Sequence, residues 1–217
     1  MKKVAVILSG CGVFDGAEIH ETVLALLAIR QHGAEYQCFA PDKAQLHVIN
    51  HLSGAEESGQ SRNVLVESAR IARGEIKPVT ELNVDEFDAL IVPGGFGAAK
   101  NLCTFATDGA DSQLDSDVAA ACKAFAKCGK PAGYACIAPA LAASVYGNNV
   151  KMTIGTDEST AQGINALGAQ HVSCPVEEII IDSEAKLVTT PAYMLAQDIL
   201  EAHAGINKMV QTVIGMA

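Results

Sequence analysis

Gly133-Tyr134-Ala135-Cys136-Ile137-Ala138-Pro139-Ala140-Leu141 is the segment from which the fold is predicted most directly. The small and apolar residues before Cys136 are typical of a buried strand. Pro139 suits the first turn of a helix, where its missing N–H has no acceptor to lose. A cysteine between such a strand and such a helix projects from a tight turn, as in a nucleophile elbow. The segment therefore predicts an α/β sheet with a reactive side chain at the end of one strand.

Cys136 is the candidate nucleophile of this turn. The backbone N–H of Ile137 can face an oxyanion that develops on a substrate carbonyl. The N-terminus of the following helix favours the thiolate form of the cysteine. A buried structural cysteine at a strand end is an equally good interpretation of these residues taken alone.

Strands and helices alternate along the rest of the chain. Short apolar runs predict buried strands, and apolar residues at helical spacing predict amphipathic helices. This order predicts a three-layer α/β sandwich with a flavodoxin-like, mostly parallel sheet, formed by residues 1–217 as one domain. The predicted strands are residues 4–8, 36–40, 45–50, 89–93, 132–135, 151–154, 177–182 and 186–190, the last two as a hairpin. The predicted helices are residues 17–31, 62–73, 114–127, 157–167 and 196–214, with a short one that follows Pro139 and ends at Tyr146.

The composition limits the partners that the protein can have. Its 217 residues include 25 acidic and 15 basic side chains, for a formal net charge of −10. An acidic surface repels nucleic acids and anionic membranes, so neither is expected as a partner. No apolar run approaches the roughly 18–20 residues that a membrane-spanning helix needs.

The cysteines indicate a reducing compartment. There are seven, an odd number, and no two of them form a C-x-x-C pair. They indicate neither a disulfide framework nor a zinc site, so no metal is expected. Free thiols are typical of reducing compartments. The seven are Cys11, Cys38, Cys103, Cys122, Cys128, Cys136 and Cys174.

Two glycine-containing loops are expected to meet the Cys136 turn at the carboxyl ends of the strands, where parallel sheets bind ligands. Gly94, Gly95 and Phe96 follow a predicted strand, and glycine N–H groups there can donate to an oxyanion. An ordinary strand-to-helix turn explains them equally well. The loop at residues 10–16 resembles a dinucleotide-binding loop, but Asp15 occupies the place of its third glycine and would repel a pyrophosphate.

Glu18 and Glu21 lie in the first turns of the helix that follows this loop. The helix dipole favours carboxylates at such positions, so capping alone can explain them. Alternatively, one of the two enters the pocket, where burial would raise its pKa and let it move protons near the thiol. His20 adjoins Glu21 and is, with Asp15, a further candidate for the pocket.

Together these motifs resemble the ThiJ/PfpI superfamily, a branch of the class I glutamine amidotransferase-like fold. Within it they resemble the bacterial isoprenoid biosynthesis proteins with an amidotransferase-like domain. The resemblance covers nearly the whole chain in order. It is carried by Ile7-Leu8-Ser9-Gly10-Cys11-Gly12-Val13-Phe14-Asp15-Gly16-Ala17-Glu18-Ile19-His20-Glu21, Ile91-Val92-Pro93-Gly94-Gly95-Phe96-Gly97-Ala98-Ala99-Lys100-Asn101-Leu102, Cys136-Ile137-Ala138-Pro139-Ala140, Thr153-Ile154-Gly155-Thr156-Asp157 and Thr189-Thr190-Pro191-Ala192-Tyr193-Met194.

The resemblance implies roles for individual residues. It assigns Cys136 as the nucleophile, Glu21 as the pocket glutamate, and Gly95 and Ile137 as the oxyanion donors. Members of this branch are described as cofactor-free glyoxalases that convert glyoxal to glycolate, an activity connected with the repair of glycated groups. They are cytosolic and often dimeric. The resemblance therefore implies a small aldehyde substrate, no cofactor, a homodimer and a cytoplasmic location.

One departure from the superfamily pattern bears on the reaction. Members with a Cys-His pair carry a histidine after the next strand, whereas this chain has Gly155-Thr156-Asp157 there. Amide hydrolysis is not expected without that base, because the leaving amine must be protonated. His20 and His171 are the two histidines that could approach the elbow from other loops.

Two other functions keep the same cysteine and glutamate and stay open at this stage. One is a redox sensor whose thiol is oxidised reversibly. The other is a non-catalytic protein that binds an enzyme of isoprenoid biosynthesis.

Overall fold

A seven-stranded sheet forms the centre of the protein. The computed structural model describes all residues from Met1 to Ala217. Neighbouring strands are parallel except β8 and β9, and their order is β3-β2-β1-β4-β5-β9-β8. The strands are β1 (Lys3–Ile7), β2 (Glu35–Ala40), β3 (Ile76–Pro78), β4 (Ala89–Val92), β5 (Ala132–Ala135), β8 (Ile180–Asp182) and β9 (Leu187–Thr190).

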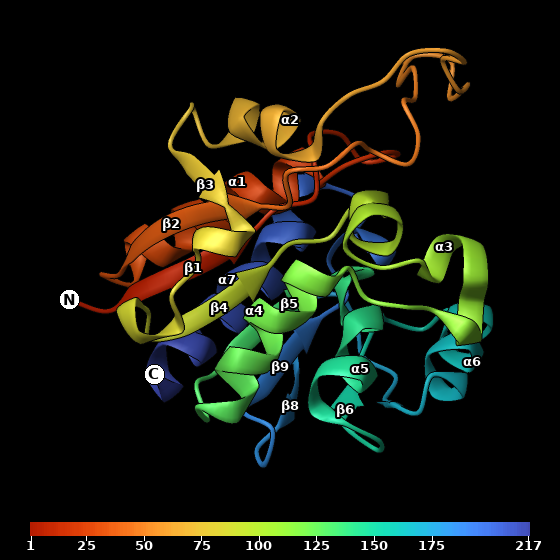
Figure 1. The fold of residues 1–217 in the computed structure, drawn as a ribbon. Coiled ribbons are helices and arrows are strands. Elements are labelled where there is room, and N and C mark those ends of the chain that lie inside the picture. The colour runs from red at the N-terminus through yellow and green to blue at the C-terminus, as the bar shows by residue number, and fades with distance from the viewer.

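Helices cover both faces of this sheet, which confirms the predicted α/β sandwich. In Figure 1, α4 lies in front of the sheet and α7 behind it, and α1 packs against α7. Side-chain oxygens of Glu18, Asn63, Asp115, Asp157 and Asp198 cap helix N-termini, where backbone N–H groups lack helical acceptors. The helices are α1 (Ile19–Gln31), α2 (Val64–Ile71), α3 (Phe105–Asp108), α4 (Ser116–Lys127), α5 (Ala142–Tyr146), α6 (Glu158–Ala166) and α7 (Ile199–Met216).

The core lies on both faces of the three central strands. Every residue of β4 and β5 is buried, as are four of the five residues of β1. Gly133 of β5 lets α7 approach the sheet closely. A Cβ at this position would lie 2.7 Å from Ile91 Cδ1 and 3.1 Å from Val213 Cγ2, so a larger residue would push the helix away.

Three predicted strands differ in the structure. The strand predicted at residues 177–182 is limited to β8 (Ile180–Asp182). Residues 45–50 form a loop, because distant side chains accept hydrogen bonds from backbone N–H groups that a strand would use for pairing. Asn101 Oδ1 accepts from the Leu46 N–H, and Asp15 Oδ2 accepts from the Ile49 N–H. The strand predicted at residues 151–154 is limited to β6 (Lys151–Met152), which pairs with β7 (Gln170–His171) in a separate two-stranded sheet.

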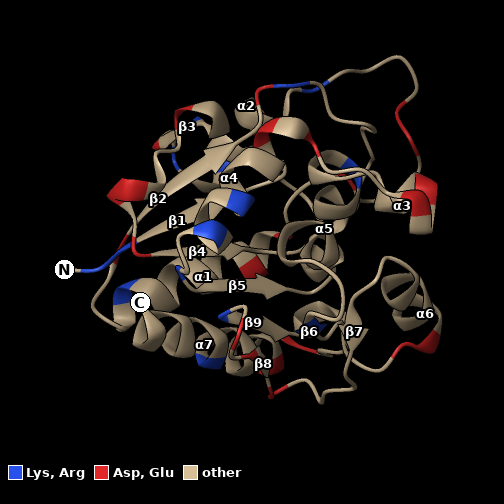
Figure 2. Ribbon diagram, turned by 60° about the horizontal axis from the view of Figure 1, so that its bottom comes forward, with Lys and Arg blue, Asp and Glu red and all other residues tan.

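No helix of the protein combines the length and the apolar character that crossing a membrane requires. Acidic and basic segments are both spread over the ribbon in Figure 2, and the 25 acidic and 15 basic side chains give the net charge of −10.

Candidate active site

Cys136 occupies a strained turn directly after β5. Its φ is +60°, a left-handed conformation that costs a non-glycine residue on the order of 1–3 kcal/mol. The N–H of Cys136 donates to the carbonyl oxygen of Thr190 at 3.0 Å, which fixes the turn against β9. A short 3₁₀ helix, Ala138–Leu141, follows and leads into α5. The chain thus has the strand–turn–helix geometry of a nucleophile elbow.

Glu21 places its carboxyl group against the thiol of Cys136. The side chain is completely buried and hydrogen-bonded to the thiol. Backbone N–H groups hold both oxygens: Gly94 donates to Oε2 and Tyr193 donates to Oε1, each at 3.0 Å. Glu18 instead caps α1, accepting from the Glu21 N–H at 2.6 Å, and its side chain lies at the wall of the cavity described below.

Burial raises the pKa of both groups in this pair. The pKa of Glu21 rises to about 7, mainly by desolvation and against the lowering effect of its hydrogen bonds. Desolvation and the neighbouring Glu21 carboxylate raise the pKa of the Cys136 thiol well above its ordinary value. The lowering of the thiol pKa that the sequence suggested is therefore wrong in direction, because the helix that follows is one short turn and its dipole does not offset burial beside an acid.

Backbone N–H groups of Gly95 and Ile137 point to the sulfur of Cys136 and hydrogen-bond to it. The other two residues of the predicted oxyanion set contribute differently. The Gly94 N–H donates to Glu21 Oε2, and the Phe96 N–H donates to the Val13 carbonyl oxygen at 2.8 Å. Gly95 and Ile137 are thus the donors available to an oxyanion formed beside the sulfur.

An apolar cavity of about 250 Å³ opens onto the thiol. Aromatic and aliphatic side chains form most of its wall, and Glu18 is its one acidic lining residue. Such a cavity excludes water and strengthens electrostatic interactions within it. It is lined by Val13, Glu18, Gly95, Phe96, Ala99, Phe105, Ala106, Cys136, Ile137, Thr160, Tyr193 and Met194.

Two of the predicted pocket residues lie outside this cavity. Asp15 is buried elsewhere, where its Oδ2 accepts from the Ile49 N–H at 2.7 Å and fastens the loop after β2. His20 is exposed, and its Nδ1 lies 3.0 Å from the Tyr193 hydroxyl. His171 belongs to β7 and is also absent from the cavity wall. No histidine therefore lines the thiol cavity.

Tyr193 is the main contributor to the site that the sequence did not reveal. It lines the cavity, and its backbone N–H bonds to Glu21. Ala192 directly before it has a φ of +45°, a conformation that orients this N–H. The available signal is Pro191 after the strand β9, which marks a turn at the same carboxyl edge as Cys136.

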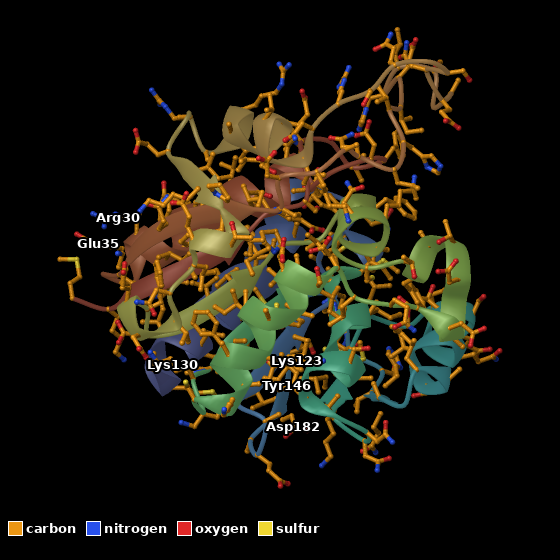
Figure 3. The ribbon with its side chains drawn as sticks, viewed as in Figure 1. Arg30, Glu35, Lys123, Lys130, Tyr146 and Asp182 are labelled. Atoms are coloured by element: carbon orange, nitrogen blue, oxygen red, sulfur yellow. The ribbon has the colours of Figure 1, made fainter.

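A larger hollow of about 410 Å³ lies at the amino ends of β5 and β9. Tyr146 and Asp182, both labelled in Figure 3, belong to its wall. Asp182 accepts hydrogen bonds there from the backbone N–H groups of Lys151, Glu184 and Ala185. These bonds stabilise the turn between β8 and β9. No group of three or more His, Cys, Asp or Glu side chains is placed to hold a metal ion.

Comparisons with known proteins identify the family. The chain is 48% identical over 221 aligned residues to the Homo sapiens "glutamine amidotransferase-like class 1 domain-containing protein 3, mitochondrial", covering 98% of this chain and 82% of the relative. It is 46% identical to the Rattus norvegicus "ES1 protein homolog, mitochondrial", with 98% and 83% covered. The chain belongs to the glutamine amidotransferase-like class 1 family that includes the ES1 proteins. No protein-family model matches it.

Solved structures agree with this assignment to the family. The crystal structure of an isoprenoid biosynthesis protein with an amidotransferase-like domain from Ehrlichia chaffeensis is 35% identical, with a TM-score of 0.91 over 99% of this chain and all of that one. A structure of glyoxalase III from Candida albicans shares the fold, with a TM-score of 0.62, 14% identity, and 99% and 97% of the two chains covered. The resemblance inferred from the motifs is therefore confirmed.

The expected cytoplasmic location is wrong on this comparison. The Homo sapiens, Rattus norvegicus and Danio rerio relatives are all named as mitochondrial proteins. Free thiols indicate a reducing compartment, but they do not distinguish one reducing compartment from another. The folded domain itself does not identify the compartment to which a protein is targeted.

Proposed function

We propose that this protein is a cofactor-independent glyoxalase, a lyase that converts glyoxal and related 2-oxoaldehydes to the hydroxy acid. One observation carries the proposal: a buried carboxyl group with a pKa of about 7 is hydrogen-bonded to a cysteine at the base of an apolar cavity. A carboxyl group with this pKa both accepts and returns protons near neutral pH. We further take residues 1–217 to act as a single domain.

The proposed reaction starts with addition of the Cys136 sulfur to one aldehyde carbon, after Glu21 removes the thiol proton. The electron pair of the C=O π bond moves to the oxygen, and the resulting oxyanion lies beside the N–H groups of Gly95 and Ile137. It takes the proton from Glu21, which gives a thiohemiacetal. Glu21 then removes the proton from that carbon, which gives an enediolate. The hydroxyl proton of the thiohemiacetal passes to the oxygen on the neighbouring carbon, and Glu21 returns its proton to that neighbouring carbon.

The product of these steps is a thioester between Cys136 and glycolic acid. Water cleaves the thioester, which releases glycolate and restores the thiol. One carbon is oxidised while the other is reduced, so the reaction consumes only water and exchanges no electrons with the surroundings.

The neighbouring proteins and the site support this activity over its alternatives. A protein of the same fold is named glyoxalase III. Amide hydrolysis is disfavoured, because no histidine lines the cavity to protonate a leaving amine. A redox-sensing thiol is typically exposed with a low pKa, whereas Cys136 is 7% exposed and its pKa is raised.

The pH dependence of glyoxal turnover tests the role of Glu21. Because burial raises the Glu21 pKa to about 7, the carboxyl group is protonated below that pH and cannot take the thiol proton. We expect kcat/KM to rise about tenfold per unit below the inflection and to bend near pH 7. Glu21→Gln is expected to lose the inflection and about 10²–10⁴-fold in rate. Glu18→Gln should keep an inflection, shifted to lower pH, because the Glu18 carboxylate contributes to the raised Glu21 pKa. The same inflection in Glu21→Gln would exclude Glu21 as the base.

We also propose a homodimer that uses the outer face of α1. Ile19, Val23 and Leu27 recur at every fourth residue on this helix and are 42–49% exposed. Such an exposed apolar stripe is typical of an interface.

Leu27→Lys is expected to turn a dimer into a monomer of 22.6 kDa, as measured by light scattering after gel filtration. Val66→Lys, at an exposed position of α2, should leave the dimer intact. A wild-type protein that runs as a monomer would contradict the proposal.

A further inference from the structure

A second groove adjoins the thiol cavity. It has a volume of about 330 Å³ and is lined by Phe14, Ile49, Gly54, Phe96, Lys100 and Ala106. Phe96 and Ala106 line both spaces, so the ring of Phe96 forms part of the boundary between them. Small-molecule sites commonly measure about 300–1,000 Å³. The two spaces together therefore suit a ligand larger than glyoxal.

Lys100 is the one charged side chain of the second groove. Its Nζ donates to the Phe14 carbonyl oxygen at 2.8 Å and lies 5.5 Å from the centre of the Phe96 ring. It makes no ion pair within 4.0 Å, unlike Lys43, which binds Asp115 at 2.8 Å. An ammonium group has three N–H donors, so Lys100 keeps donors for a ligand.

The free-energy cost of partly burying the Lys100 ammonium group is not fully offset by nearby negative charges. Desolvation lowers its pKa, and the more distant carboxylates of Asp15 and Glu56 oppose this only in part. A partly buried cation without a counter-ion is stabilised when an anion binds beside it. The thiol cavity has the opposite character, because Glu18 is its one charged lining residue and Glu21 lies buried behind Cys136, so an anion would be disfavoured there.

Ordered contacts hold the wall of the second groove in place. Asp15 Oδ2 accepts from the Ile49 N–H at 2.7 Å, and His51 Nε2 accepts from the Phe14 N–H at 3.2 Å. The His51 ring also packs on Phe14, with 5.0 Å between ring centres. The loop after β2 is thereby fastened to the loop after β1, and the groove is preformed.

We propose that this groove binds an anionic group of the substrate while the substrate carbonyl faces Cys136. The substrate is then a 2-oxoaldehyde that carries a carboxylate or phosphate beyond a flat or apolar spacer, which packs on Phe96. This inference rests on the proposed function for the reacting end of the molecule, whereas the anion site at Lys100 rests on the geometry of the groove.

Binding of two unreactive ketones tests the inference. 4-Acetylbenzoate has a carbonyl, a ring and a carboxylate, and acetophenone is the same molecule without the carboxylate. We expect calorimetry to give about tenfold tighter binding of 4-acetylbenzoate to the wild-type protein, the effect of one charge-assisted hydrogen bond. Lys100→Met should reduce the ratio of the two affinities to within about twofold. Lys100→Arg, which keeps the charge, should retain most of the preference.

A matched control removes a positive charge elsewhere. Lys123 of α4, labelled in Figure 3, is exposed and lines neither space, so Lys123→Met should keep the full preference. Equal binding of the two ketones to the wild-type protein, or a preference that survives Lys100→Met in a folded variant, would overturn the inference. Thermal unfolding of each variant shows whether it is folded.

Glyoxal turnover separates this inference from the proposed function. A Lys100-dependent preference in a protein that makes no glycolate would refute the glyoxalase and keep the anion site. Glycolate formation without such a preference would refute the anion site and keep the glyoxalase.

Discussion

Replacing Cys136 by serine is expected to lower glyoxal turnover by at least about 10³-fold, to a rate near that of buffer. Serine keeps the size and the turn, but its hydroxyl is a far weaker nucleophile without a dedicated base, and removal of a catalytic nucleophile typically costs this much or more. The variant should fold, because the N–H bond from residue 136 to Thr190 is made by the backbone. Loss of glyoxal, followed with purified protein under reducing conditions, provides the measurement.

Cys128→Ser is the matched control for this substitution. Cys128 is exposed at the end of α4 and lies outside the thiol cavity, so its replacement should leave turnover unchanged. Turnover that survives in Cys136→Ser, or that falls equally in Cys128→Ser, would contradict the role of Cys136.

Gly94→Ala is expected to have the second largest effect. A Cβ at this position would lie 2.2 Å from Cys136 Cβ, 2.7 Å from Glu21 Oε2 and 2.9 Å from Cys136 Sγ. The two side chains that form the proposed catalytic pair would have to separate. Displacement by about 1 Å can cost about 10²-fold in rate, and overpacking of a buried site costs about 1–3 kcal/mol of stability. We therefore expect both losses, measured by turnover and by chemical unfolding.

Gly215→Ala provides the comparison for the glycine substitution. Gly215 lies in α7 and has no neighbour within 4 Å of an added Cβ. Alanine is the better helix former by roughly 0.5–1 kcal/mol, so this variant should be as stable as the wild-type protein or slightly more stable, with full turnover. A Gly94→Ala protein that behaved in the same way would show that the pair tolerates displacement.

The central sheet could be predicted because its strands have a local signature. The segments that form β1, β4 and β5 consist mainly of small and apolar residues and are followed directly by Ser9-Gly10, Pro93 and Cys136. The loop at residues 45–50 has a similar local pattern, but its backbone bonds to Asp15 and Asn101 from distant segments. Such contacts depend on the tertiary fold and cannot be predicted from a short segment of sequence.

The site was predictable only to the extent that its residues form motifs. Cys136 follows a strand and precedes Pro139, and the family resemblance selected Glu21 over Glu18. Tyr193 and Thr160 line the cavity from the turn after β9 and from α6; both segments could be predicted, but their approach to the cavity could not. The direction of the thiol pKa was also beyond prediction, because it depends on complete burial and on contact with Glu21 across the fold.

Deuterium in the product tests the central claim most directly. Glyoxal is incubated with wild-type protein and with Cys136→Ser in D₂O, after treatment with a chelator, and the products are followed by proton NMR. The proton that Glu21 returns to carbon comes from a group that exchanges with solvent, so the account predicts glycolate with deuterium at its methylene carbon from the wild-type protein and none from Cys136→Ser. Absence of glycolate above the buffer rate, or equal glycolate from both proteins, would contradict the account.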